Sequence, residues 1–305
     1  MRFSIKIKSF LIAAALMIPV SSLSAFAEEE NNFTYTIINN EATIIGYTGE
    51  PVYLEIPETV EGCPVTQIRD NAFFSCTSLR QISLPSSIKK IGHHTFYACN
   101  SLESIVLPAQ LEEIGMGAFN GCNSLSAINI PASLEVLPES CFRSCSSLTE
   151  VVLPGRIMEI GDFCFSGCSA LSYVSLPEST RKIGAGAFYS CGTLESLYIP
   201  PSVETIKYEA VGYENTGSDS LVQSDFVIMG KSGSAAEDYA DDNGLEFSKA
   251  SEALQSPVSS SAKLRKVPMW ILLLLSCGGT GFFALSCVIA VKQHRYEKKK
   301  SLESD

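Results

Sequence analysis

The cysteines offer the widest choice of chemistry in this 305-residue chain, because thiols can form disulfides, bind metals or act as nucleophiles. The two closest pairs, Cys141 with Cys145 and Cys164 with Cys168, lack the turn and the histidines that are typical of a zinc site. We therefore expect no bound metal. Six of the 11 cysteines recur at a constant interval of 23 residues, which indicates one structural position repeated in every unit: Cys76, Cys99, Cys122, Cys145, Cys168 and Cys191.

The redox state of these thiols has two interpretations. Exported cysteines usually pair, and stacked units would place the Cα atoms about 5 Å apart, within disulfide range. However, parallel side chains in one column do not give the torsion angle that a disulfide requires. We expect mostly free, buried thiols that act as small apolar side chains, with a ladder of disulfides as the alternative. Cys63 belongs to no column, so its state stays open.

Groups suited to catalysis are sparse. Only His93 and His94 lie outside the C-terminal tail, and neither has an obvious nucleophile nearby in the sequence. The chain has no glycine-rich phosphate loop and no H-E-x-x-H motif. Its net charge of −11 argues against a nucleic-acid binder, which needs a basic face. We predict that the protein is not an enzyme, uses no cofactor and binds no nucleic acid.

The cysteines belong to a repeat in which several other columns keep the same register. Isoleucine, leucine and proline positions follow the pattern I-G-x-x-A-F-x-x-C-x-x-L-x-x-I-x-L-P. A fixed period of this length is typical of a solenoid, whose stacked units bury one continuous core. The largest side chains of that core form a phenylalanine column: Phe73, Phe96, Phe119, Phe142, Phe165 and Phe188.

Two local structures are expected in each unit. The I-x-L-P segment alternates between inward and outward positions, which predicts a short strand that ends at the proline. The A-F-x-x-C-x-x-L segment has apolar residues three apart, the spacing of a short helical or 3₁₀ stretch. The sequence therefore predicts an α/β solenoid in which parallel strands line one concave face.

This pattern resembles the BspA-like leucine-rich repeat family of surface proteins. The resemblance covers roughly residues 33–249, because Ile56-Pro57 is similar to the family's starting unit and Gly244-Leu245-Glu246-Phe247 to its closing unit. It implies a leucine-rich repeat fold with 23-residue units. It also implies adhesion to extracellular proteins or binding of them.

The closing unit contains one regular helix in this interpretation. Ser234 is expected to cap a helix over residues 235–243, with Glu237 completing a capping box and Gly244 ending the helix. The preceding residues, 208–225, break the period and predict an irregular excursion. A different terminal unit is expected because an open solenoid end exposes apolar columns and strand edges.

Both ends of the chain carry apolar segments that suggest targeting. A cleaved signal peptide is predicted at the N-terminus by basic residues, an apolar run and the sequence Ala25-Phe26-Ala27. Near the C-terminus, residues 267–291 carry no charged side chain over a length that could span a bilayer. More basic residues follow this stretch than precede it, which favours a cytoplasmic C-terminus. The predicted domains are a signal peptide (1–27), a starting unit (28–67), six repeats (68–207), an irregular segment and cap (208–249), a Ser-rich linker (250–266), a transmembrane helix (267–291) and a basic tail (292–305).

The charge is distributed unevenly along the chain. Residues 28–262 hold 11 Lys and Arg against 30 Asp and Glu, so the predicted exported part carries 11 − 30 = −19. This acidity keeps an ectodomain soluble and repels anionic polymers and anionic lipid.

One surface patch is a candidate for binding. Tyr173 and Tyr198 point outward on successive predicted strands, with Glu150 and Val152 next to them. The alternative is an ordinary β-surface, on which aromatic residues are common.

We predict a single-pass cell-surface protein, non-catalytic, that recognises or adheres to an extracellular or envelope protein. The alternative is an accessory or structural subunit that partners another envelope membrane protein. The predicted linker of about 16 residues favours this alternative in a thick-walled cell, because its root-mean-square span is only ~20–24 Å. The short tail would allow signalling only through a partner.

Overall fold

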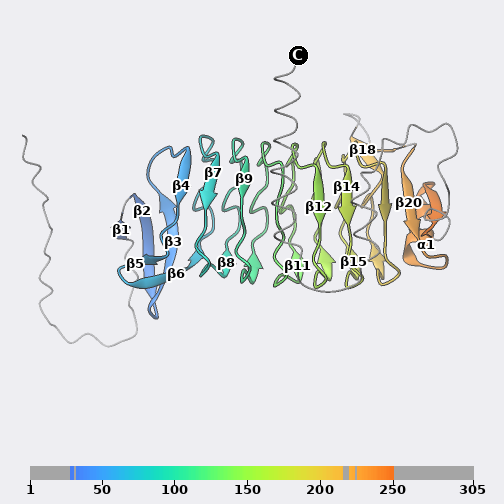
Figure 1. Cartoon of the computed structure of the whole chain (residues 1–305). Helices are drawn as coiled ribbons and strands as arrows, with labels where there is room; N and C mark the ends of the chain where they lie inside the picture. Colours follow the sequence, from blue (N-terminus) through green and yellow to red (C-terminus); the bar gives the residue numbers. More distant parts are fainter. Residues whose placement is uncertain (1–27, 31, 216–219, 224, 251–305) are drawn as a thin grey trace, which may run out of the picture. The chain divides into compact units, whose positions relative to one another are not determined.

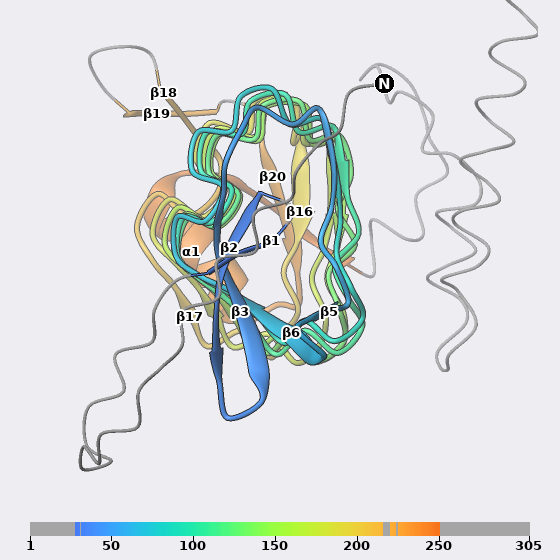
Figure 2. The same cartoon turned by 90° about the vertical axis from the view of Figure 1, so that its left-hand side faces the viewer.

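The computed structural model describes residues 28–30, 32–215, 220–223 and 225–250. The predicted signal peptide at residues 1–27 lies outside this range, as do all but the first residue of the linker, the apolar segment 267–291 and the basic tail. Within the described part, the chain winds into a β-solenoid whose turns lie side by side (Figure 1). Figure 2 looks along this stack, where successive turns superimpose.

One row of short parallel strands, the first strand row, comes from the predicted I-x-L-P segments. In it Gln81 lies opposite Ser104, and Glu150 lies opposite Tyr173, so the offset is the 23-residue period. The stacking that the period predicts is therefore confirmed. The first strand row consists of β4 (Tyr53–Glu55), β7 (Gln81–Ser83), β9 (Ser104–Ile105), β12 (Glu150–Val152), β14 (Tyr173–Ser175), β16 (Ser196–Tyr198), β20 (Val227–Gly230) and β21 (Glu246–Lys249).

A second strand row lies on another side of each turn and was not predicted. It is formed by the isoleucine or leucine that opens each unit, together with the residue before it, as where Lys90 lies opposite Glu113. The second strand row consists of β6 (Cys63–Ile68), β8 (Lys90–Ile91), β10 (Glu113–Ile114), β11 (Val136–Leu137), β13 (Glu159–Ile160), β15 (Lys182–Ile183) and β17 (Thr205–Ile206). The starting unit extends it with β1 (Glu28–Glu30), β2 (Phe33–Ile38) and β3 (Glu41–Tyr47), and adds β5 (Thr59–Val60) beside β6.

The third side of each turn, the turn side, holds the A-F-x-x-C segment, and here the predicted α/β class is wrong. Two residues four apart adopt left-handed conformations in each unit, for example Ser140 (φ 55°) and Ser144 (φ 59°). A left-handed residue ends a right-handed helical turn, so no helix develops. Some N–H groups donate three residues back as isolated turns, as from Cys145 N to Phe142 O at 3.2 Å. Others bond to the next turn, as where Phe142 N donates to Cys164 O at 2.8 Å.

The fold is therefore a β-solenoid whose described residues contain one short α-helix, α1 (Ala235–Asn243). The fold prediction also included a C-terminal transmembrane helix, and this part is not supported either. None of the helices among the described residues is long and apolar enough to cross a membrane, and the predicted segment 267–291 falls outside them.

The core is built from columns that contact themselves from turn to turn. The six column phenylalanines are buried, and neighbouring rings stack with centroids 5.3–5.4 Å apart. Each later thiol of the cysteine column donates to the carbonyl of the phenylalanine 26 residues before it, as from Cys145 Sγ to Phe119 O at 3.3 Å. The other members do so at 3.1–3.2 Å. The column thus fills space and gives one carbonyl per turn a second bond, beside the backbone bond that the same carbonyl accepts, as from Cys122 N to Phe119 O.

The C-terminal cap contains the predicted helix, but its N-terminus differs in detail. Helix α1 spans the predicted residues and ends at Gly244, which is left-handed with φ 65°. The Ser234 hydroxyl makes no capping bond. The Glu237 carboxylate instead accepts from Gly233 N at 2.6 Å and from the Ser232 hydroxyl. The predicted capping box is therefore wrong, because the Glu237 carboxylate binds the backbone N–H of Gly233 and not that of Ser234.

The segment before the cap is more regular than predicted. Strands β18 (Tyr213–Asn215) and β19 (Ser220–Val222) pair antiparallel. Across this excursion Ser196 lies opposite Val227, an offset of 227 − 196 = 31 residues instead of 23. The inserted residues thus leave the first strand row, and β20 rejoins it beside β16.

Candidate interaction face

The outward side chains of the first strand row form a face that runs along the stack. Residues between them point inward, as Val151, Val174 and Leu197 do, and are almost fully buried. This alternation follows from the two-residue repeat of a strand. We name as the first strand face these residues: Gln81, Ser83, Ser104, Val106, Ala127, Asn129, Glu150, Val152, Tyr173, Ser175, Ser196 and Tyr198.

Three of the four predicted patch residues lie on two paired strands. Glu150 of β12 lies opposite Tyr173 of β14, and Val152 lies opposite Ser175. Val152 is 60% exposed, whereas Tyr173 is half-buried. These side chains therefore share one continuous piece of sheet.

Tyr198 lies across a boundary between two sheets. It belongs to β16, which bonds to β20 and not to β14, and its own partner is Met229. Tyr198 is 36% exposed, and burial, followed by the nearby Glu178 carboxylate, raises the pKa of its phenol. The phenol is therefore a neutral hydrogen-bonding group at physiological pH.

Two more exposed side chains belong to the same row but were missed as candidates. Val106 is 73% exposed and occupies the column of Val152. Tyr53 is 71% exposed and lies opposite Gln81, an offset of 81 − 53 = 28 residues. The column position was a sufficient signal for Val106. For Tyr53 it was not, because the starting unit departs from the 23-residue period.

Charge separates the first strand face from the outward side of the second strand row. Within the first strand face, Glu150 is the sole charged residue. The second strand row instead carries cross-strand ion pairs, Lys90 with Glu113 at 2.9 Å and Lys182 with Glu159 at 2.6 Å. The first strand face is thus nearly uncharged from β7 to β16, whereas the two ends of the same row carry the exposed Glu55 of β4 and Glu246 of β21.

Both described histidines have structural contacts. Met116 N donates to His93 Nδ1 at 2.9 Å, and the backbone N–H of His93 donates to the Asp70 carboxylate at 2.8 Å. The His94 ring meets the Tyr97 ring edge-on. It also lies so close to Gly117 that a Cβ atom at that position would clash with the ring. Among the described residues, no group of three or more His, Cys, Asp and Glu side chains could hold a metal ion.

The thiols are poorly suited to reaction. The nine cysteines of the described residues are all free, and all are buried except Cys76, which is half-buried at the N-terminal end of its column. Burial raises the pKa of Cys99 to about 12 and that of Cys191 to about 12. Because the thiolate is the nucleophile and the metal ligand, these groups stay protonated and inert.

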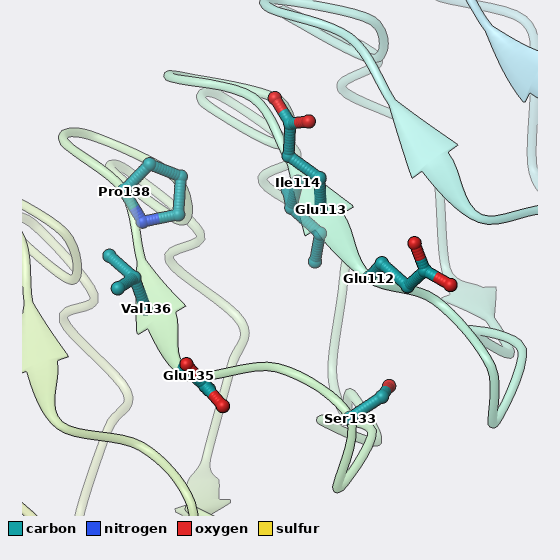
Figure 3. A pocket seen from close by; sticks show the side chains of 7 residues that line it. All are labelled: Glu112, Glu113, Ile114, Ser133, Glu135, Val136 and Pro138. Carbon is teal, nitrogen blue, oxygen red and sulfur yellow. The ribbon is translucent and has the colours of Figure 1, made fainter.

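An open cleft of about 370 Å³ lies on the second strand row, between β10 and β11 (Figure 3). Its lining comprises Glu112, Glu113, Ile114, Ser133, Glu135, Val136 and Pro138. The one hydroxyl there, on Ser133, already donates to the Leu111 carbonyl. The lining therefore offers carboxylates and apolar walls, without an activated nucleophile.

Comparisons with known proteins identify the repeat. A family model described as the BspA type leucine rich repeat region matches residues 53–151 and 89–217, with six copies, which confirms the resemblance. A T. pallidum leucine rich repeat protein is 35% identical over 60% of this chain and 84% of its own, with a TM-score of 0.54. A leucine rich cell surface protein from Faecalibacterium prausnitzii is 26% identical over 70% of this chain, with a TM-score of 0.55.

This chain covers 66% of the Faecalibacterium protein. A leucine-rich repeat protein from Bacteroides ovatus, 22% identical over 73% of this chain and 67% of its own with a TM-score of 0.55, shares the fold. None of the curated proteins matches this chain. The chain belongs to the BspA-type leucine-rich repeat family.

Proposed function

We propose that this protein acts at the cell surface as a non-catalytic recognition protein, and that it binds a partner protein through the first strand face. Cell-surface location is supported by the Faecalibacterium protein, which is called a leucine rich cell surface protein. Adhesion is the form of recognition that the family resemblance suggests. No catalytic step is proposed.

The observation that carries this proposal is the exposure of apolar and aromatic side chains on a nearly uncharged face. Val152 and Tyr198 remain accessible, and Tyr173 lies between them with part of its ring exposed. Tyrosine is enriched at the energetic centres of protein interfaces, because it provides large contact area together with one polar group. An uncharged centre also lowers the desolvation cost of binding.

Site-specific photo-crosslinking on intact cells tests the proposal. A photoreactive side chain replaces Val152 in one variant and Val136 in another. These are two exposed valines, 60% and 45% accessible, on the first and the second strand row respectively. We expect a protein adduct from position 152 and none from position 136.

Equal adducts from both positions, or none from position 152, would contradict binding through the first strand face. The identity of the adduct separates the two forms of the function. A partner from another cell or from the medium supports adhesion. A partner from the same envelope supports the accessory-subunit alternative.

A further inference from the structure

Both strand rows are interrupted at the same level of the solenoid. On the second strand row, β10 pairs with β8 and β11 pairs with β13, but β10 and β11 do not pair with each other. On the first strand row, residues 127–130 form no strand between β9 and β12 in the described chain. We call the boundary between the turn that contains residues 104–114 and the turn that contains residues 127–137 the gap level.

A proline explains part of the interruption on the second strand row. Four equivalent positions in other units are glycine: Gly92, Gly115, Gly161 and Gly184. In the intact unit, Gly161 N donates to Leu137 O at 2.8 Å. Pro138 occupies this position at the gap level and has no N–H, so it cannot donate to Ile114 O.

Close approach of the turns also depends on that column. A Cβ atom on Gly161 would lie 2.5 Å from Glu139 N of the preceding turn, which is closer than real contacts allow. Proline carries a Cβ atom and a ring at this point. Pro138 therefore holds β11 away from β10, and the cleft of about 370 Å³ lies between them (Figure 3).

Two carboxylates face each other across the gap level. Glu112 and Glu135 are 23 residues apart and so occupy equivalent positions in adjacent turns, where no cross-strand ion pair of the described chain joins the turns, because Glu135 pairs with Arg156 of the following turn. In intact levels the equivalent backbone bonds are short, from Glu112 N to Lys89 O and from Met158 N to Glu135 O, both 2.8 Å. Among the bonds of the described turns, none joins Glu135 N to Glu112 O.

A side chain replaces the backbone ladder on the first strand row. Asn129 Oδ1 accepts from Leu107 N at 2.9 Å, and Asn129 Nδ2 donates to Leu107 O at 2.9 Å. The amide thereby takes both backbone groups that a neighbouring strand would use. Two side-chain bonds thus hold the turns together here, in place of strand pairing.

The turn side remains continuous past the gap level. Gly117 N donates to Glu139 O at 2.9 Å, and Phe119 N donates to Cys141 O at 2.9 Å. The rings of Phe119 and Phe142 stack at 5.4 Å, as in the other units. Backbone bonding between the turns is therefore continuous on the turn side, whereas on the two strand rows side-chain bonds join the turns instead, from Asn129 to Leu107 and from Ser133 Oγ to Leu111 O.

We propose that the gap level is a hinge, at which the two strand rows separate and approach while the turn side acts as the pivot. The described turns up to Ile114 then move as one block, and those from Val136 onward move as another. Opening changes the separation of Val106 and Val152, which lie on opposite sides of the hinge on the first strand face. This inference does not depend on the proposed function.

Amide hydrogen exchange at single-residue resolution on the full chain tests the hinge. We expect the Leu107 amide, which donates to Asn129 Oδ1 across the gap level, to exchange at least about tenfold faster than the matched amide of Leu153, which donates to Ser175 O, since hinge opening breaks the first bond and not the second. The turn-side amides of Phe119 and Phe142 are expected to stay slow. Equal protection of Leu107 and Leu153 would overturn the proposal.

A variant sharpens the test. Pro138→Gly restores the N–H and the space of the glycine column, which closes the second strand row, so exchange at Leu107 on the first strand row is expected to slow at least about tenfold. Pro154→Gly is the matched control, because it makes the same substitution just after β12, in the next unit, and adds no ladder bond of this kind. Slow exchange at Phe119 reports that each variant is folded. The same change at Leu107 in both variants, or none in either, would also overturn the hinge.

Discussion

The two strand rows bury similar columns but present different outward faces. Inward residues of both rows, such as Ile183 and Leu197, are fully buried. Several outward residues of the second strand row form ion pairs within the molecule. Those of the first strand face are mostly serine, valine and tyrosine, and among them Asn129 bonds to the neighbouring turn. Stability is thus shared by the two rows, and the capacity to bind is concentrated on one.

The difference follows from what each outward side chain can still gain. Lys90 and Glu113 already satisfy each other, so a partner would have to compete with an existing bond and desolvate two charges. Val152 and Tyr198 gain mainly by leaving water.

The largest predicted effect tests whether the buried side chains of the two rows contribute equally to stability. Leu197→Ala on the first strand row and Ile183→Ala on the second are each expected to lower the free energy of unfolding by about 2–5 kcal/mol, because both side chains are almost inaccessible. Urea unfolding of the full chain measures this. Val152→Ala, an exposed position, serves as control and is expected to change stability by no more than about 0.5 kcal/mol. A large cost on one row alone would show that the core is not shared.

The second effect concerns binding and rests on the proposed function. Replacing Tyr173 and Tyr198 together by serine is expected to weaken binding of the partner crosslinked at position 152 by about 2 kcal/mol or more, roughly 30-fold in Kd. Titration of the purified partner measures it. The matched change on the other row, Lys90→Gln with Glu113→Gln, is expected to leave Kd within about twofold. Equal losses from both double variants would remove the distinction between the faces.

The sequence specifies the period and the core of this fold more fully than its backbone. The phenylalanine and cysteine columns predict the stacking, because a constant interval can be buried only by repeating the same turn. The second strand row could not be recognised, since strands of two residues such as Lys90–Ile91 are too short to show alternation. The sequence predicts a short helical or 3₁₀ stretch on the turn side, because apolar residues three apart fit both a helix and the isolated turns that the structure has there. The left-handed residues of the turn side include Ser140 and His94, without the glycine that usually signals such a conformation.

The candidate site was only partly predictable for a similar reason. Tyr173 and Tyr198 could be placed on one face from the period alone, but the sheet boundary between β14 and β16 could not. The departure of Pro138 from a column of glycines is visible in the sequence. Its consequence depends on the bond that glycine makes to the preceding turn, from Gly161 N to Leu137 O, and this bond is a property of the assembled stack.

A third, smaller effect separates the faces electrostatically. A double-mutant cycle on Lys90 and Glu113 is expected to give a coupling energy of about 0.2–1 kcal/mol, because both side chains are about half exposed. The coupling should shrink in 1 M salt, where charges are screened within about 3 Å. Gln81 and Ser104, opposite each other on the first strand row of the same two units, provide the control pair. Their coupling should not respond to salt, and a salt-dependent value there would contradict the assignment of charge to one face.

The smallest effect is a pH dependence at the end of the second strand row. Burial raises the pKa of Asp162. Hydrogen bonds from Lys207 Nζ at 2.9 Å and from Ala185 N at 2.9 Å lower it by more than burial raises it, so the pKa lies below its usual value. A carboxylate with a lowered pKa stabilises the fold above the pKa of the unfolded chain, about 3.9, and this stabilisation is lost as the pH falls through the folded value. We expect Asp162→Asn to be less stable than the natural protein at pH 7, by less than about 1 kcal/mol since the pair is partly exposed.

The two proteins should become equally stable as the pH approaches 3, because the natural side chain is then increasingly protonated. Thermal unfolding at intervals from pH 7 to pH 3 measures the difference. Val152→Ala is the control on the first strand face, because this exposed side chain carries no titratable group. Its stability difference from the natural protein should stay nearly constant over this range. A difference that widens toward low pH at Asp162 would mean that its carboxylate destabilises the fold, and that the ion pairs of the second strand row do not act in the same direction.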